Sequence, residues 1–264
     1  MAASPLSIRY WQGITSVPGG GGLVFTGIAK GIFRTDLALG RKAANESAIP
    51  ASVRRSEGFN HIGDPSFDPS AGGRILLPLE CFNPLSGDDP CRRGAIGVAD
   101  PVSLHWRYYV KVSAASARKL MWVEASPDGR LVWTSAADDL LAFAASEVNQ
   151  RNAGPDGALR PVRRLRGALE GLPNVSGGAF WRGRLLLAGQ SGRRFEVNSV
   201  DLSDGSARRE IQLSLAGESE GLATVNFAGG VLQWQVMPRL DPFPPSYLRP
   251  TLLSFEPRQG AQRP

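Results

Sequence analysis

Residue types that carry chemistry recur in short polar segments that precede strongly apolar runs. His61 and Asp64 lie three positions apart in one such segment, and Glu124 and Glu220 lie in two later segments of the same kind. A carboxylate near a histidine moves the histidine pKa toward neutrality, which suits a general acid or base. We therefore predict catalytic roles for His61, Asp64, Glu124 and Glu220, as a hydrolase or lyase would use them.

The same segments also suit a hard cation. Calcium prefers carboxylate and amide oxygens of mixed charge, supplied from several parts of a chain. The residues predicted to bind Ca²⁺ are Asn60, Asp64, Glu124 and Glu220. The plainer alternative is a solvated channel, in which these groups bind water or one another and hold no ligand.

A further set of residues is predicted to bind a small polar molecule or a glycan. It consists of Gln12, Asn60, Trp122, Ser176, Glu218 and Ser219. Tryptophans at 11, 122, 133, 181 and 234 recur near the apolar runs. Such aromatic side chains stack on sugar rings, although they more often fill the gaps between packed sheets.

One segment matches the residue pattern of a catalytic motif but not the secondary structure that the motif requires. Gly217–Gly221 has the pattern G-x-S-x-G. The chemistry of that motif requires a strand, a strained turn and then a helix. Because the residues after Gly221 have the composition of a strand, we do not expect Ser219 to be a nucleophile.

The two cysteines favour an oxidising compartment. Cys81 and Cys91 flank a segment rich in glycine, proline, asparagine and aspartate. A disulfide there would close a surface loop, as is common in exported proteins. We expect a secreted or periplasmic protein; a pair of free thiols in the cytosol is the alternative. Zinc is not expected, since neither histidine lies near the pair at ligand spacing.

Charge and hydropathy argue against a nucleic-acid-binding protein and against a membrane-spanning protein. The formal net charge is +6, but the arginines are scattered, apart from one cluster at 160, 163, 164 and 166. That cluster is typical of the solvated face of an edge strand, so nucleic acid is not an expected partner. No apolar stretch is long enough to cross a bilayer, and we expect no membrane span. We expect a monomer.

A weak internal repeat is the strongest signal for the fold. Five times a glycine turn starts a short apolar run, at glycines 51, 56, 54 and 47 residues apart. Continuous apolar runs are typical of strands buried on both faces. The five runs are Gly22–Thr26, Gly73–Leu77, Gly129–Trp133, Gly183–Leu187 and Gly230–Trp234.

Each run has further strand-like segments around it, about four per repeat of roughly 50 residues, which is the size of a propeller blade. The sequence therefore predicts an all-β fold: a five-bladed β-propeller that forms a single domain over residues 1–264. We expect an N-terminal strand, Leu6–Tyr10, to complete the last blade and leave no bare edge. A β-sandwich or another number of blades is the competing architecture.

Several of these segments also resemble those of a known group. Gly58–Asp64 with Arg74–Glu80, and Glu218–Leu222 with Gly229–Trp234, resemble motifs in uncharacterised secreted bacterial β-propeller-like proteins. The resemblance extends along most of the chain and implies export and the repeat fold. It implies no activity and no catalytic residue.

The leading functional prediction is a secreted propeller that binds a small polar ligand or glycan at the mouth of its central channel, with calcium as a candidate cofactor. The alternatives are a hydrolase or lyase that uses His61 with channel carboxylates, and a protein-interaction scaffold. The residues do not decide among the three.

Overall fold

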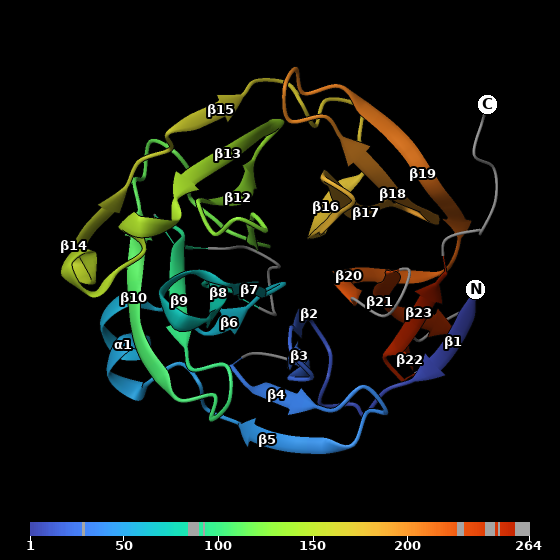
Figure 1. Ribbon diagram of the computed structural model, residues 1–264, viewed down its shortest axis with the longest axis horizontal. Coiled ribbons are helices and arrows are strands. Elements are labelled where there is room, and N and C mark those ends of the chain that lie inside the picture. Colours follow the sequence, from blue (N-terminus) through green and yellow to red (C-terminus); the bar gives the residue numbers. More distant parts are fainter. Residues whose placement is uncertain are drawn as a thin grey trace.

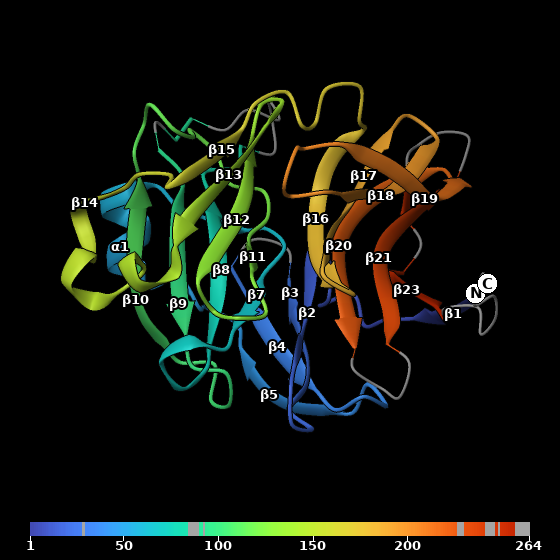
Figure 2. The ribbon, with the colours of Figure 1, turned by 45° about the horizontal axis from the view of Figure 1, so that its top comes forward.

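The computed structural model describes residues 1–27, 30–83, 90–91, 93–225, 230–240, 246–247 and 249–256. Five β-sheets, antiparallel except for the β10–β14 pair of one sheet, stand in a ring around a common axis, so the protein is a five-bladed β-propeller (Figure 1). Within each blade the strands follow one another from the axis outward, and Figure 2 shows the innermost strands gathered at the centre.

The blades are numbered in chain order. Blade 1 holds β2 (Gly13–Val17), β3 (Gly22–Thr26), β4 (Ile32–Thr35) and β5 (Arg41–Asn45). Blade 2 holds β6 (His61–Ile62), β7 (Ser66–Asp68), β8 (Arg74–Glu80), β9 (Ala95–Ala99), β10 (Trp106–Val112) and β14 (Gly154–Leu159). Blade 3 holds β11 (Glu124–Ala125), β12 (Leu131–Ala136), β13 (Asp139–Ala144) and β15 (Arg163–Leu165).

Blade 4 holds β16 (Asn174–Trp181), β17 (Arg184–Ser191), β18 (Arg194–Val200) and β19 (Ala207–Ser214). Blade 5 holds β20 (Gly217–Val225), β21 (Val231–Leu240), β22 (Ser246–Tyr247), β23 (Thr251–Phe255) and β1 (Ala2–Pro5). The helical elements are α1 (Ala51–Glu57) and the 3₁₀ turns η1 (Ser70–Gly72), η2 (Ala145–Glu147) and η3 (Gln150–Asn152).

The five apolar runs are the second strands of the five blades, as predicted. They form β3, β8, β12, β17 and β21, and every residue of β3 and β8 is buried. A second strand lies inside its sheet with a blade packed on each face, so no side of it meets water. This position explains why the runs are continuously apolar instead of alternating.

Five separate hydrophobic clusters hold the ring together, one at each joint between neighbouring blades. One cluster joins blades 2 and 3, and the other four join blades 1 and 2, 3 and 4, 4 and 5, and 5 and 1. The largest fully buried side chains, Trp122, Trp133 and Trp234, lie in these clusters. Each joint therefore buries one face of two blades, which neither blade could do alone.

Ring closure follows the predicted principle but uses different residues. β1 pairs antiparallel with β23, so the N-terminal strand completes the last blade. The strand is Ala2–Pro5 and not Leu6–Tyr10. Leu6 and Tyr10 instead pack in the cluster between blades 5 and 1, where their apolar side chains are buried. The longer apolar side chains fill the joint, and the small residues before them form the outer strand.

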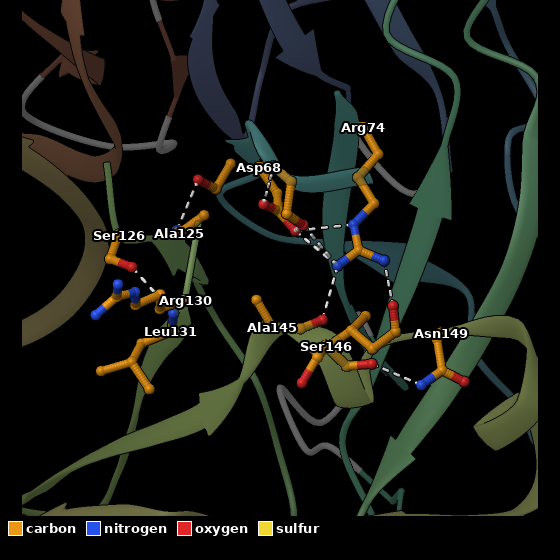
Figure 3. Close-up of polar contacts among 12 residues, drawn as sticks. Asp68, Arg74, Ala125, Ser126, Arg130, Leu131, Ala145, Ser146 and Asn149 are labelled. Carbon is orange, nitrogen blue, oxygen red and sulfur yellow. Dashed lines mark hydrogen bonds and ion pairs between the residues drawn. The ribbon is translucent and has the colours of Figure 1, made fainter. Parts of the chain in front are cut away.

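A buried ion pair secures the joint between blades 2 and 3. Arg74 Nε lies 2.8 Å from Asp68 Oδ2, and its Nη2 donates to the carbonyl oxygen of Ala145 at 2.8 Å. A further bond runs from Nη1 to the carbonyl oxygen of Val148. Figure 3 shows the guanidinium between the Asp68 carboxylate and the η2 turn. The arginine thus neutralises a fully buried carboxylate and satisfies two carbonyl groups of the next blade.

The cysteines form the predicted disulfide, with Cα atoms of Cys81 and Cys91 5.2 Å apart. Three elements near blades 1 and 2 were not predicted: β5, α1 and the parallel strand β14. In the described ranges, no helix is long and apolar enough to cross a membrane.

Candidate functional site

The propeller axis is organised around one carboxylate. Asp64 Oδ1 accepts the backbone N–H of Ile14 at 2.8 Å, and Oδ2 accepts those of Gly178 at 3.2 Å and Leu222 at 3.3 Å. The Asp64 backbone bonds to Met121 and Val123 of blade 3. Because Asp64 itself belongs to blade 2, a single residue bonds to the other four blades of the ring.

Glycines let the inner strands approach this carboxylate. A Cβ atom at Gly221 would lie 2.3 Å from Asp64 Oδ1, and one at Gly13 would lie 2.5 Å from Asp64 Cα. We call this level of the axis the collar, formed by Gly13, Ile14, Asp64, Gly177, Gly178, Gly221 and Leu222. It leaves no room for another methyl group, so it divides the axis into two separate ends.

Residues that precede the collar in each inner strand form the upper opening, and residues that follow it form the lower mouth. The lower mouth contains a cavity of about 340 Å³ to which every blade contributes. One lining residue from each blade is Thr15, Ser66, Glu124, Phe180 and Thr224. The predicted channel mouth is therefore present at this end of the axis.

Glu124, which is half-buried, lies at the base of the lower mouth. Its Oε2 accepts the Ser66 hydroxyl at 2.6 Å, and its Oε1 accepts the Phe180 N–H at 3.0 Å. Burial raises the pKa of Glu124 to about 8, and the two hydrogen bonds only partly oppose this rise. At neutral pH the side chain is therefore mainly a neutral acid, which can both donate and accept a hydrogen bond.

Aromatic side chains form a wall of the lower mouth. Phe180 and Trp181 come from the end of β16, and Phe67 comes from β7. Arg182, in the turn after β16, holds its guanidinium 4.5 Å from the centroid of the Trp181 ring. The mouth thus combines a ring-stacking surface with a polar base, the combination that sugar rings require.

The upper opening holds a chain of ionisable groups in which Glu80 lies between His61 and Lys119. His61 Nδ1 lies 3.0 Å from Glu80 Oε1, and Glu80 Oε2 lies 3.1 Å from Lys119 Nζ. His61 and Glu80 face each other in the β6–β8 pair, and both are buried. The carboxylate orients the imidazole ring, as in an acid–base dyad.

Glu220 joins this group from blade 5. Burial raises the pKa of Glu220 well above its ordinary value, and the hydrogen-bonded Glu218 side chain raises it further, with smaller contributions from Asp64 and Glu80. Its Oε1 atom is buried and has no hydrogen-bond partner among the described residues. His61, Glu80, Lys119, Glu218 and Glu220 thus form one electrostatic group above the collar.

The four residues predicted as catalytic are not brought to one place. His61 and Glu220 lie above the collar, Asp64 forms it, and Glu124 lies below it. His61 bonds to Glu80 and not to Asp64, because Asp64 is occupied by backbone N–H groups of three other blades. The four residues therefore lie at three levels of the axis, and their catalytic roles stay predictions.

The predicted ligand-binding residues also have separate roles. Asn60 uses both ends of its amide on the backbone of Phe82, beside the disulfide. Trp122 is fully buried and donates to Ser135, so a ligand cannot reach it. Ser176 and Ser219 bond to each other between blades 4 and 5 at 2.9 Å. Gln12 precedes β2 at the upper opening, and Glu218 is exposed there.

A calcium site does not follow from this arrangement. In the part of the chain that the structure describes, no three histidine, cysteine, aspartate or glutamate side chains are grouped so that they could hold a metal ion. The amide of Asn60 is already used, and Glu124 is separated from Glu220 by the collar. Calcium binding therefore stays a prediction from the sequence.

Sequence reasoning missed Glu80, Lys119, Ser66 and Arg182. Two of them carry a signal in the sequence. Glu80 is a charge at the end of an otherwise apolar run, and Arg182 follows Trp181 immediately before the Gly183 turn. The roles of Lys119 and Ser66 cannot be read from the sequence, because they depend on which blades meet at the axis.

Comparison with known proteins supports the fold. No family model and no curated protein matches the chain. Among solved structures, a glutaminyl cyclase from Myxococcus xanthus is 11% identical, with a TM-score of 0.57 over 96% of this chain and 93% of that one. At this identity the likeness shows the propeller architecture alone.

Two further solved structures have a similar fold at low sequence identity. A glucose dehydrogenase is 11% identical, with a TM-score of 0.51 over 98% of this chain and 100% of that one. A gluconolactonase from Xanthomonas campestris is 17% identical, with a TM-score of 0.50 over 89% of this chain and 68% of that one. Both share the fold with this chain.

Proposed function

We propose that the protein binds a small polyhydroxylated molecule, such as a monosaccharide, in the lower mouth. The observation that carries this proposal is the axial cavity, which all five blades line and which ends at the half-buried acid Glu124 beside Phe180 and Trp181. A volume of about 340 Å³ lies at the small end of the range of ligand pockets, and so suits one small ring.

The chemistry of the lining supports the same ligand class. Neutral Glu124 offers both a donor and an acceptor, which a hydroxyl group can meet. The flat indole of Trp181 offers a face for the C–H side of a sugar ring. The glucose dehydrogenase and the gluconolactonase among the similar solved structures are named for sugars or sugar derivatives, which agrees with such a ligand on this fold.

Isothermal titration with a panel of neutral and acidic monosaccharides tests the proposal. Wild-type protein should bind at least one of them, and Trp181→Leu should weaken binding about fivefold, since stacking contributes roughly 1 kcal/mol beyond burial. His61→Asn lies beyond the collar and is the matched control that should leave the affinity unchanged. Failure of every sugar to bind, or equal binding by the Trp181 variant, would refute the proposal.

Acid–base catalysis at the upper opening is the second candidate function. It is favoured by the His61–Glu80–Lys119 chain, beside which a separate cavity of about 780 Å³ includes Lys119. A hydrolase or lyase working there should lose turnover in His61→Asn while keeping its affinity for substrate. A screen of lactone, ester and glycoside substrates that finds no turnover in wild-type protein would reject this candidate.

We further propose that the protein works in an oxidising compartment, secreted or periplasmic. The Cys81–Cys91 disulfide supports this placement, because such bonds persist outside the reducing cytosol. Cellular fractionation of the native host tests it, and recovery of the protein with free thiols from the cytosol would contradict it.

A further inference from the structure

The charged side chains of the lower mouth limit the kind of ligand that it can bind. Among the described residues that line the cavity, two have ionisable side chains: Glu124 at the base and Arg182 at the rim. The others are apolar residues, hydroxyl residues, prolines and a glycine. The balance between Glu124 and Arg182 therefore sets the sign of charge that the cavity accepts.

At neutral pH this balance is positive. The burial that raises the pKa of Glu124 to about 8 keeps its carboxyl protonated, so the base of the cavity carries little charge. The guanidinium of Arg182 remains charged at any accessible pH. The lower mouth thus presents one positive charge above a neutral acid.

Arg182 is placed to receive an anion. It lies with φ of 48° in the tight turn between β16 and β17, and its guanidinium rests over the Trp181 ring. No carboxylate of the described residues forms an ion pair with it. A stacked guanidinium keeps its N–H donors at the edge of the plane, in the fork geometry that fits a carboxylate.

We infer that the ligand of the lower mouth is a sugar acid, a polyhydroxylated molecule whose carboxylate binds Arg182 while its ring lies against Trp181 and its hydroxyls reach Glu124. This inference rests on the proposed function and adds the charge of the ligand to it. A neutral sugar would leave the Arg182 donors to water, and an ammonium ligand would meet a like charge at the rim.

The other ionisable groups near Glu124 do not reverse this sign. Asp64 lies behind it in the collar, where burial raises the pKa of the carboxyl well above its ordinary value. Asp128, in the turn after β11, is exposed, accepts the Ser126 hydroxyl and lies 3.7 Å from Arg130. The elements from blades 1, 4 and 5 that line the cavity add only Arg182.

A pH dependence follows from Glu124. As the pH rises through about 8, this side chain loses its proton, and the new negative charge at the base repels a bound carboxylate. Affinity for a sugar acid should therefore be highest below pH 7 and should fall above pH 8. In Glu124→Gln the base stays neutral, so the affinity should be nearly flat over the same range.

The test compares D-glucuronate with D-glucose at pH 6.5 by isothermal titration. Wild-type protein should bind glucuronate about tenfold or more tightly than glucose, a difference of about 1.4 kcal/mol. Arg182→Gln should bring the affinities for glucuronate and glucose within about twofold of each other. Arg184→Gln removes the neighbouring arginine of the same hairpin, which does not line the cavity, and should keep the preference.

Arg182→Lys keeps the charge without the planar fork and should retain part of the preference, so it serves as a second variant if the glutamine variant does not fold. Equal affinities of wild-type protein for the two sugars, or an unchanged preference in Arg182→Gln, would overturn the sugar-acid inference alone. Failure of both sugars and of the rest of the panel to bind would overturn the proposed function as well.

Discussion

Asp64 of blade 2 accepts the backbone N–H of Leu222 in blade 5, a residue 158 positions later in the chain, at 3.3 Å. The same carboxylate reaches blades 1 and 4, so it ties the ring together at its centre. This bond also decides where function can lie. Because the collar fills the axis at this level, a ligand at one end cannot touch groups at the other.

Replacement of Asp64 by Ala should destabilise the protein by about 3 kcal/mol or more. Three buried N–H groups would lose their acceptor, and each unsatisfied buried group costs roughly 1 to 3 kcal/mol. Asp64→Asn keeps one acceptor oxygen and should cost less. Urea unfolding measures both, with the exposed Asp204→Ala as control; a loss below about 1 kcal/mol in Asp64→Ala would show that the collar does not depend on this carboxylate.

Glu124→Gln should become more stable relative to wild type as the pH rises. The pKa of Glu124 moves from an ordinary 4.5 to about 8 in the folded protein, so the folded state binds the proton more tightly than the unfolded chain. Wild-type stability should therefore fall between about pH 4.5 and 8, on the order of 4 kcal/mol, while the stability of the glutamine variant should not fall for this reason. Thermal unfolding from pH 5 to 9 measures the difference, and parallel curves would contradict it.

Removal of residues 1–5 should lower the melting temperature and promote association. β1 covers the outer edge of β23, and its loss would leave a row of unpaired backbone groups that can pair with another chain. Calorimetry and light scattering after gel filtration measure the two effects. Removal of Met1 alone, which lies outside β1, is the control, and an unchanged oligomeric state with equal stability would contradict the closing role of the strand.

Arg74→Met should cost about 3 to 5 kcal/mol, because it leaves the Asp68 carboxylate buried without a counter-charge. The double variant Arg74→Met with Asp68→Leu removes both charges and should recover part of that loss. Arg107, which is 40% exposed in its pair with Asp100, is the control, and Arg107→Met should cost less than about 1 kcal/mol. Equal losses for the two arginines would contradict the prediction.

Reduction of the disulfide should cost about 2 to 3 kcal/mol, as expected for closure of a loop with a sequence separation of 10. The double variant Cys81→Ser with Cys91→Ser measures this without added reductant. A loss well below 1 kcal/mol would show that the loop is held by its other contacts.

The sequence was sufficient for the fold because the strongest signal for a propeller is local. A second strand such as β8 is covered on both faces, so its central residues from Ile75 to Leu79 are all apolar, and the number of such runs gives the number of blades. The closing strand was placed on Leu6–Tyr10 because apolar residues there look like a strand. The preference of these side chains for the joint between blades is a tertiary effect that a linear pattern does not contain.

The site was predicted less well than the fold. Its geometry depends on how far each of the five inner strands is shifted along the axis relative to the others. The polar residues near the inner strands were identified, but a shift of two or three positions along a strand decides whether a side chain lies above, within or below the collar. His61 and Asp64 are neighbours in the sequence and yet have different partners, since Glu80 reaches His61 only through the pairing of β6 with β8.

The most direct test of a ligand site below the collar is a crystal structure of the protein soaked with the monosaccharide that binds most tightly in solution. We expect electron density for the sugar ring against Trp181, with a hydroxyl group within hydrogen-bond distance of Glu124. Density above the collar, between His61 and Glu220, would contradict this account.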